Sequence, residues 1–182
     1  MKFLENINRV MTNSRWISNR KIYEQTELYK TLVWDVKHSD KIFIVGNGGS
    51  NAISEHIATD LFKRCDKNVI TLSNNSLLTC LSNDYGYENA LVKFLNMYDI
   101  TPNDLLIVIS SSGKSKNILN VLETYKHCKV VFIHGFSQHV HTDKDICYHI
   151  YLPSDNYGVI EMASEIILHS IVEDIVQENL SN

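Results

Sequence analysis

Two short segments rich in glycine and serine have residue types that bind phosphate. They are residues 46–50, GNGGS, and residues 110–115, SSSGKS. A helix beginning at Ser115 would present unpaired backbone N–H groups and the positive end of its dipole, which favour an anion. Four serine hydroxyls within six residues add uncharged donors. A helix cap in a solvated loop would account for one serine but not for four. We therefore expect a phosphate-binding loop at residues 110–115.

Neither segment matches a nucleotide-binding motif. A P-loop ending at Ser115 would need glycine at position 108, which is Val108. The first segment lacks the third glycine of a dinucleotide fingerprint, because position 51 is Asn51. The sequence therefore supports neither ATP nor NAD as the ligand.

The elements around these segments alternate between strand and helix. Apolar, β-branched strands are expected at 41–45, 68–72, 105–109 and 129–134, with a more polar strand at 146–152 that would lie at an edge. Helices are expected at 51–64, 87–97, 115–127 and 158–180, and residues 1–38 also have helical spacing, with a break near Asn13. Apolar strands alternating with helices predict a three-layer α/β fold with a parallel sheet covered on both faces. Ligands of such sheets bind beyond the carboxyl ends of the strands, where both small-residue turns lie.

Length and composition limit the classes of protein. The 182 residues predict one domain, 1–182, with residues 1–38 packed on it as a helical segment. A formal net charge of −4 disfavours nucleic acid as a partner. The apolar runs are too short to cross a bilayer, and Glu5 interrupts any signal-peptide core. We expect a cytoplasmic protein that binds neither membranes nor nucleic acid.

The order of the motifs resembles that of a known family. The segment 46–50, His56 with Asp60, residues 83–87 (NDYGY) and the segment 110–115 together resemble the sugar isomerase (SIS) domain. Within that family they are most similar to the phosphoheptose isomerases, and the resemblance covers nearly the whole chain. It implies a five-stranded parallel sheet flanked by helices. It also implies a homotetramer with active sites at subunit interfaces, a phosphorylated sugar substrate and one zinc ion per subunit.

The resemblance implies a set of metal and catalytic residues on two helices. His56 and His169 match the family, whereas Asp60 stands where the family has glutamate and Glu161 where it has glutamine. The implied zinc ligands are His56, Asp60, Glu161 and His169, with Asp60 as the base and His169 as the opposing acid. Eight residues of straight helix rise roughly 12 Å. Glu161 and His169 therefore reach one metal only if both lean inward or the helix starts after Glu161.

The resemblance also implies the residues that bind the substrate. The implied substrate and phosphate residues are Asn47, Gly48, Ser50, Arg64, Asn83, Asp84, Ser110, Ser111, Ser112, Ser115 and Glu161. For Arg64 the alternative is a structural role, as a cation near the C-terminus of its helix.

The implied reaction is an aldose–ketose isomerisation. It converts sedoheptulose 7-phosphate to D-glycero-D-manno-heptose 7-phosphate, which supplies heptose for lipopolysaccharide or capsule. Because Asp60 and Glu161 differ from the residues of the family, an isomerase that acts on a different phosphosugar is one alternative. A non-enzymatic SIS protein that binds the bacterial replication initiator is a second alternative. A sugar-phosphate sensor is a third, although the chain has no spare segment for a DNA-binding helix-turn-helix.

Overall fold

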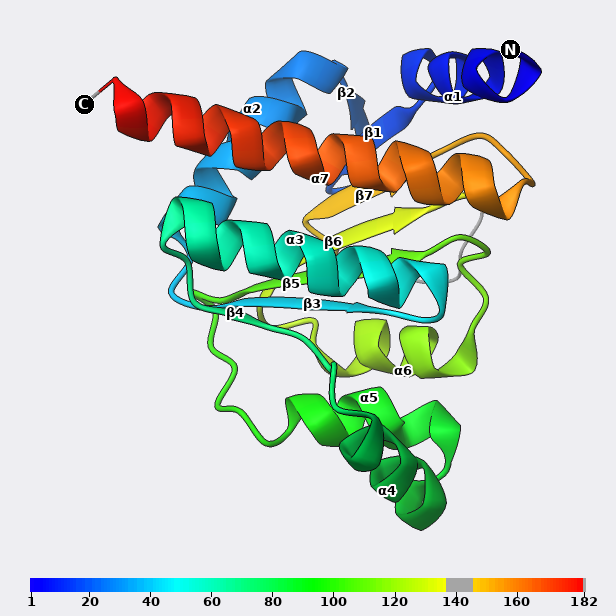
Figure 1. The fold of residues 1–182 in the computed structure, drawn as a ribbon, viewed down its shortest axis with the longest axis vertical. Helices are drawn as coiled ribbons and strands as arrows, with labels where there is room; N and C mark the ends of the chain where they lie inside the picture. Colours follow the sequence, from blue (N-terminus) through cyan, green and yellow to red (C-terminus); the bar gives the residue numbers. More distant parts are fainter. Residues whose placement is uncertain (137–145, 182) are drawn as a thin grey trace.

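The computed structural model describes residues 1–136 and 146–181. These residues form three layers, a mixed sheet between two layers of helices (Figure 1). The strand order is β2-β1-β7-β6-β5-β3-β4. The five parallel strands are β3 (Ile42–Gly46), β4 (Val69–Ile70), β5 (Leu105–Ser110), β6 (Lys129–His134) and β7 (Tyr148–Tyr151). Two antiparallel strands, β1 (Arg15–Ser18) and β2 (Lys21–Tyr23), extend the sheet beyond β7. The predicted α/β class with a five-stranded parallel sheet is confirmed.

Helices cover both faces of this sheet. One face carries α1 (Lys2–Thr12), α2 (Gln25–His38), α3 (Gly49–Cys65) and α7 (Tyr157–Leu180). The other carries α4 (Asn75–Tyr85), α5 (Tyr87–Leu95) and α6 (Lys116–Thr124). Successive residues of β3 explain the division: Ile42 and Ile44 pack into the first core, and Phe43 and Val45 into the second. Strands buried on both faces need an unbroken apolar run.

Residues 1–38 are only partly helical: the first helix ends near Asn13, where a break is predicted, but two strands follow it before the next helix. They form α1, the β1–β2 hairpin and α2. Asn19 and Arg20 turn the hairpin, with φ angles of 48° and 63°. Two successive residues with positive φ match the turns that join two antiparallel strands, although the usual glycine signal is missing. The buried Trp16 pairs with Ile150 of β7.

One further expectation about the elements is wrong, and one helix was not predicted. The strand predicted at 146–152 is not an edge strand, because β1 pairs with its free side and makes β7 internal. Helix α4 was not among the predicted helices. Its N-terminus is capped by the Asn74 side chain, which accepts a hydrogen bond from the Leu77 N–H.

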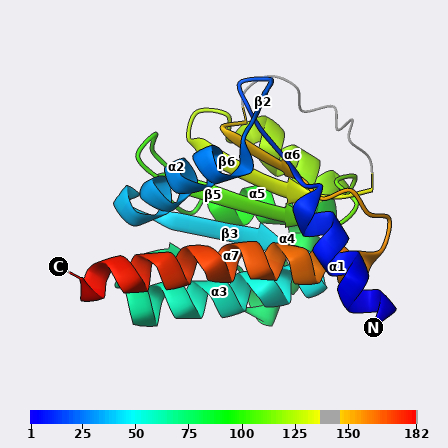
Figure 2. The same cartoon turned by 90° about the horizontal axis from the view of Figure 1, so that it is seen from above.

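Helices α3 and α7 lie side by side and run in the same direction (Figures 1 and 2). Helix α7 is continuous from Tyr157 to Leu180, and Asn156 caps it by accepting a hydrogen bond from the Val159 N–H. Because the two helices are parallel, residues early in α3 face residues early in α7, and later residues face later ones. This register decides which side chains of the two helices meet. Within residues 1–136 and 146–181, no helix has the length and apolar character needed to cross a membrane.

A buried acid ties α2 to the sheet. Asp35 is 7% exposed, and its Oδ1 accepts a hydrogen bond from Lys129 Nζ of β6 at 2.6 Å. Its Oδ2 accepts a hydrogen bond from the Tyr148 hydroxyl of β7. Burial and the bond to Asp35 raise the pKa of Tyr148, so this phenol stays protonated as the donor.

We predict that Asp35→Ala lowers the free energy of unfolding by about 2–3 kcal/mol, because it leaves Lys129 and Tyr148 without their acceptor. The matched control is Asp40→Ala, which removes an exposed aspartate and is expected to change stability by less than about 0.5 kcal/mol. Urea denaturation followed by circular dichroism measures both. Equal effects of the two substitutions would contradict the role given to Asp35.

Candidate active site

Two asparagine side chains connect the glycine turn (residues 46–50), which follows β3, to the start of α6 just after the serine loop (residues 110–115), which follows β5. Asn47 Nδ2 donates to Asn117 Oδ1 at 2.9 Å, and Asn117 Nδ2 donates back to Asn47 Oδ1 at 2.7 Å. The Tyr87 hydroxyl donates to the same Asn47 oxygen at 2.9 Å. Asn117 is 2% exposed and begins α6, so the pair fixes the two predicted binding segments relative to one another.

Two serines of this loop hold it through their hydroxyl groups, and a third has a hydroxyl without a partner among the described residues. Ser110 Oγ accepts a hydrogen bond from the Gly113 N–H, and Ser112 Oγ accepts one from the Lys114 N–H. Ser111 Oγ is buried and has no hydrogen-bond partner in the described part of the chain. Ser115 stands at the N-cap of α6 without forming a side-chain cap bond. An unpaired buried hydroxyl beside a helix N-terminus is what a phosphate would satisfy.

The glycines of this turn have close neighbours or a positive φ angle. A Cβ at Gly46 would lie 2.7 Å from the backbone carbon of Ser50, and a Cβ at Gly49 would lie 2.5 Å from Glu161 Oε1. Gly48 has φ of +55°, in the left-handed region, with open space beside it. The Glu161 carboxylate therefore lies against the first turn of α3, beside the glycine turn.

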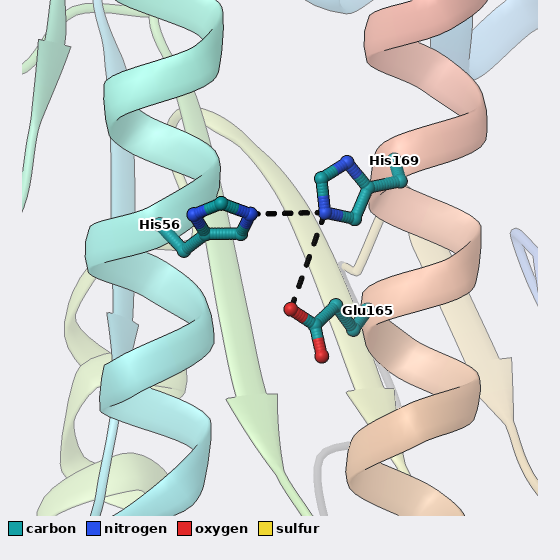
Figure 3. Close-up of side chains that lie close together, drawn as sticks. All are labelled: His56, Glu165 and His169. Atoms are coloured by element: carbon teal, nitrogen blue, oxygen red, sulfur yellow. Dashed lines mark hydrogen bonds and ion pairs between the residues drawn. The ribbon is translucent and has the colours of Figure 1, made fainter.

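A second group of polar side chains lies further along the α3–α7 contact. His56 Nε2 of α3 and His169 Nε2 of α7 are 3.1 Å apart, and Glu165 Oε1 is 4.0 Å from His169 Nε2 (Figure 3). One ligand atom from each of the three residues lies within 4.8 Å of the other two. Glu165 and His169 are four residues apart and so share a face of α7. We call His56, Glu165 and His169 the triad.

An ion-pair network adjoins the triad on the other side of the His169 ring. Asp60 Oδ2 lies 3.7 Å from His169 Nδ1 and 3.8 Å from Arg64 Nη1. Arg64 donates two hydrogen bonds to the Glu173 carboxylate, at 2.6 and 2.9 Å. These bonds hold the pKa of Glu173 below its ordinary value. Asp60 thus faces the nitrogen of His169 that points away from His56 and Glu165.

The donors of the triad fit a zinc ion. Two imidazole nitrogens and one carboxylate oxygen are the ligand types of zinc sites that keep a fourth position open for water or substrate. Bonds of about 2.0–2.1 Å in a tetrahedral site hold the ligand atoms roughly 3.3 Å apart. The His56–His169 nitrogen distance of 3.1 Å is close to that value. Glu165 Oε1 is farther, at 4.0 Å from His169 Nε2 and within 4.8 Å of His56.

The described histidines include one further close pair. His134 of β6 and His149 of β7 are in contact through their Nε2 atoms. Burial lowers the pKa of His134 to about 3, and its ring stacks on Phe132 at 4.5 Å. Among residues 1–136 and 146–181, the triad alone unites three possible metal ligands.

The residues predicted for the site fall into separate places. The structure brings His56 and His169 together and places Asp60 beside them. Glu161 lies at the glycine turn. Asn83 and Asp84 are exposed at the end of α4, on the face of the sheet opposite His56, and Asn83 Nδ2 donates to Asp84 Oδ1. Arg64 is held by Glu173 near the end of α3.

Two residues of this arrangement were not selected from the sequence. Glu165 is the third member of the triad, and its spacing of four from His169 was a usable signal. Asn117 joins the two loops, but nothing in its local sequence distinguishes it from other asparagines in helices. Its partner Asn47 is 70 residues away, so their contact depends on the adjacency of β3 and β5.

Comparison with known proteins identifies the family. A family model described as the SIS domain matches residues 2–133. Phosphoheptose isomerase 2 of Campylobacter jejuni is 34% identical over 151 residues, which cover 79% of this chain and 74% of that protein. A phosphoheptose isomerase from C. jejuni serotype O:6 is 28% identical over 180 residues, covering 91% of this chain and 96% of its own.

Solved structures share the fold. The phosphoheptose isomerase of Neisseria gonorrhoeae has a TM-score of 0.75 at 19% identity, covering 96% of this chain and 93% of its own. That of Francisella tularensis has a TM-score of 0.74 at 22% identity, covering 97% and 95%. The chain therefore belongs to the SIS domain family and, within it, to the phosphoheptose isomerases.

Proposed function

We propose that the protein is an aldose–ketose isomerase that converts sedoheptulose 7-phosphate to D-glycero-D-manno-heptose 7-phosphate, a precursor of lipopolysaccharide or capsule heptose. Two features of one chain carry the proposal. The serine loop contains the Ser111 hydroxyl, which has no partner among the described residues, and α3 and α7 carry a histidine–carboxylate group. Its 34% identical relative is a phosphoheptose isomerase. A phosphosugar isomerase needs both parts, one for the phosphate and one for proton transfer.

In this proposal the serine loop binds the phosphate. Ser111 and Ser115 donate hydroxyl hydrogen bonds to phosphate oxygens, and the first N–H groups of α6 contribute their positive dipole end. Ser110 and Ser112 hold the loop by accepting its own N–H groups. Asn47, Gly48, Ser50 and Glu161, which surround the glycine turn, bind the sugar hydroxyls.

Proton transfer is assigned to Asp60. Its carboxylate takes a proton from C1 of the ketose, which gives an enediol, and the proton returns at C2 to give the aldose. A second proton moves from the oxygen on C1 to the oxygen on C2, so the atoms balance without a redox partner. His169 faces Asp60 at 3.7 Å and, as the predicted opposing acid, would carry the second transfer. Arg64 lies 3.8 Å from Asp60, which favours the ionised carboxylate that a base requires.

His56 and His169, with a carboxylate of the same group, would hold the zinc ion that the family resemblance implies. A zinc ion bound there would stabilise negative charge on the substrate oxygens as a Lewis acid. The protein residues orient this site through the packing of α3 on α7.

The proposed assembly is a homotetramer. The exposed surface of α7 beside the triad carries Met162 and Ile166, at 38% and 44% exposure. An open groove of about 490 Å³ runs along α7 there, lined by Ile166 and His169 among others. A second subunit covering this surface would exclude water from the triad and could bring its own Asn83 and Asp84 to the substrate.

We predict that Asp60→Asn lowers kcat by about 10²–10⁴-fold, because the amide cannot accept the substrate proton. The control is Asp66→Asn, which makes the same change of charge at an exposed residue just beyond α3. Turnover of sedoheptulose 7-phosphate is followed by NMR. If Asp60→Asn and His169→Ala both retained wild-type turnover, the assignment of the reacting group would be wrong.

Ser111→Ala is expected to raise KM about tenfold and to leave kcat within about threefold, because the lost hydrogen bond to a charged phosphate is worth roughly 1.5 kcal/mol. Ser76→Ala removes an exposed hydroxyl and is expected to change neither constant. Initial rates over a range of substrate concentrations separate the two constants. A fall in kcat alone would place Ser111 outside the phosphate site.

The proposed tetramer has a mass four times that of the 20.9 kDa chain. Light scattering after size-exclusion chromatography is expected to give this mass for the wild type and a smaller mass for Ile166→Glu, which introduces a charge into the surface around the triad. A monomeric wild type with full activity would contradict the shared assembly.

A further inference from the structure

We propose that Glu165 is the carboxylate ligand of the metal in this chain, and that Asp60 lies outside the coordination sphere as the residue that positions His169. This inference rests on the proposed function, because the metal is part of it. It departs from the family resemblance, which gives the ligand roles to the residues at positions 60 and 161.

Three side chains that can each ligate a metal converge in the triad. His56 Nε2 and His169 Nε2 are 3.1 Å apart, and Glu165 Oε1 is within 4.8 Å of both. A proton shared between the two imidazole nitrogens engages that pair and leaves the carboxylate out. A divalent cation satisfies all three at once, and the remaining position is open toward solvent because His56 is exposed.

Asp60 faces the opposite nitrogen of His169. Its Oδ2 is 3.7 Å from Nδ1, whereas Nε2 faces His56 and Glu165. A carboxylate on that side favours the tautomer with the proton on Nδ1, which leaves the Nε2 lone pair free for a metal. Metal-binding histidines commonly donate their second N–H to a carboxylate in this manner.

Arg64 and Glu173 keep Asp60 in that place. Glu173 holds the Arg64 guanidinium through two hydrogen bonds, and Arg64 Nη1 attracts Asp60 from 3.8 Å. Aspartate is one methylene shorter than the glutamate that the family resemblance puts at this position. The shorter side chain and the cation together keep its carboxylate on the Nδ1 side of the ring.

Within one subunit, the register of the helices keeps Glu161 away from the triad. It lies on the same unbroken helix as His169, eight residues earlier, which corresponds to roughly 12 Å along the axis. Its carboxylate is beside Gly49, seven residues before His56 on α3. Glu165, one turn before His169, is the α7 acid that the register brings to the triad.

The two helices would supply carboxylates with different roles. Helix α7 supplies the carboxylate ligand, and helix α3 keeps an uncoordinated carboxylate at Asp60. An uncoordinated carboxylate retains the free lone pairs that the proposed base requires.

Cobalt binding tests the assignment without using activity. The full-length protein is freed of metal with a chelator and titrated with Co²⁺, and the visible absorption bands and calorimetric affinity are recorded. We expect Glu165→Gln to weaken Co²⁺ binding by more than about 100-fold and to shift the bands. Asp60→Asn is expected to keep the band positions and to weaken binding by about 10–100-fold, as loss of an outer carboxylate does. Glu161→Gln, the same substitution one turn before Glu165, is expected to change neither quantity.

Three results would overturn the inference. One is a Glu165→Gln variant that binds Co²⁺ with the wild-type spectrum and affinity. Another is an Asp60→Asn or Glu161→Gln variant whose bands shift, which would make that residue the ligand. The last is a wild-type protein that binds no Co²⁺ or Zn²⁺. Isomerase activity of the chelated protein is measured in parallel and tests the proposed reaction separately. A wild type that binds no metal but isomerises the substrate would overturn the ligand assignment and leave the proposed reaction standing.

Discussion

The parallel packing of α3 against α7 is the constraint on which the site depends. The two helices run in the same direction, so one register fixes every facing pair along their length. Glu161 meets Gly49 at the start of the contact, His169 meets His56 in its middle, and Glu173 meets Arg64 toward the end of α3. A shift of one residue would turn these side chains through about 100° and separate every pair.

The core explains why this register is stable. Helix α7 buries Ile160, Ala163, Ile167, Ile171 and Ile175 against the sheet and its neighbouring helices, and α3 buries Ile53, Ile57 and Leu61 in the same cluster. Each helix therefore presents its polar side chains in a narrow strip beside the contact rather than around its whole circumference. Interactions between charged groups then position the side chains of that strip. Arg64 lies between the carboxylates of Asp60 and Glu173, and Asp60 lies between Arg64 and His169.

Much of the architecture could be predicted from the sequence because it follows from local patterns. The apolar runs at 105–109 and 129–134 became β5 and β6, and the long apolar period after residue 158 became α7. The β1–β2 hairpin was missed because its turn uses Asn19 and Arg20 at positive φ instead of glycine. The internal position of β7 depends on that hairpin, so one unrecognised turn produced both errors.

The candidate site could be predicted only as far as individual segments. The serine loop and the two histidines could be placed from the sequence after a strand or on a helix. The partner of each residue depends on packing between distant segments. Glu165 shows the difference. Its spacing from His169 is visible in the sequence, but its contact with His56 requires the α3–α7 register.

The most direct measurement of the central claim is an NMR experiment with sedoheptulose 7-phosphate in D₂O, run with added zinc and after chelation. An enediol mechanism with a carboxylate base predicts conversion to the aldoheptose phosphate with solvent deuterium at C2, because a proton held on the base can exchange with solvent. Absence of both conversion and deuterium exchange under either condition would contradict the account.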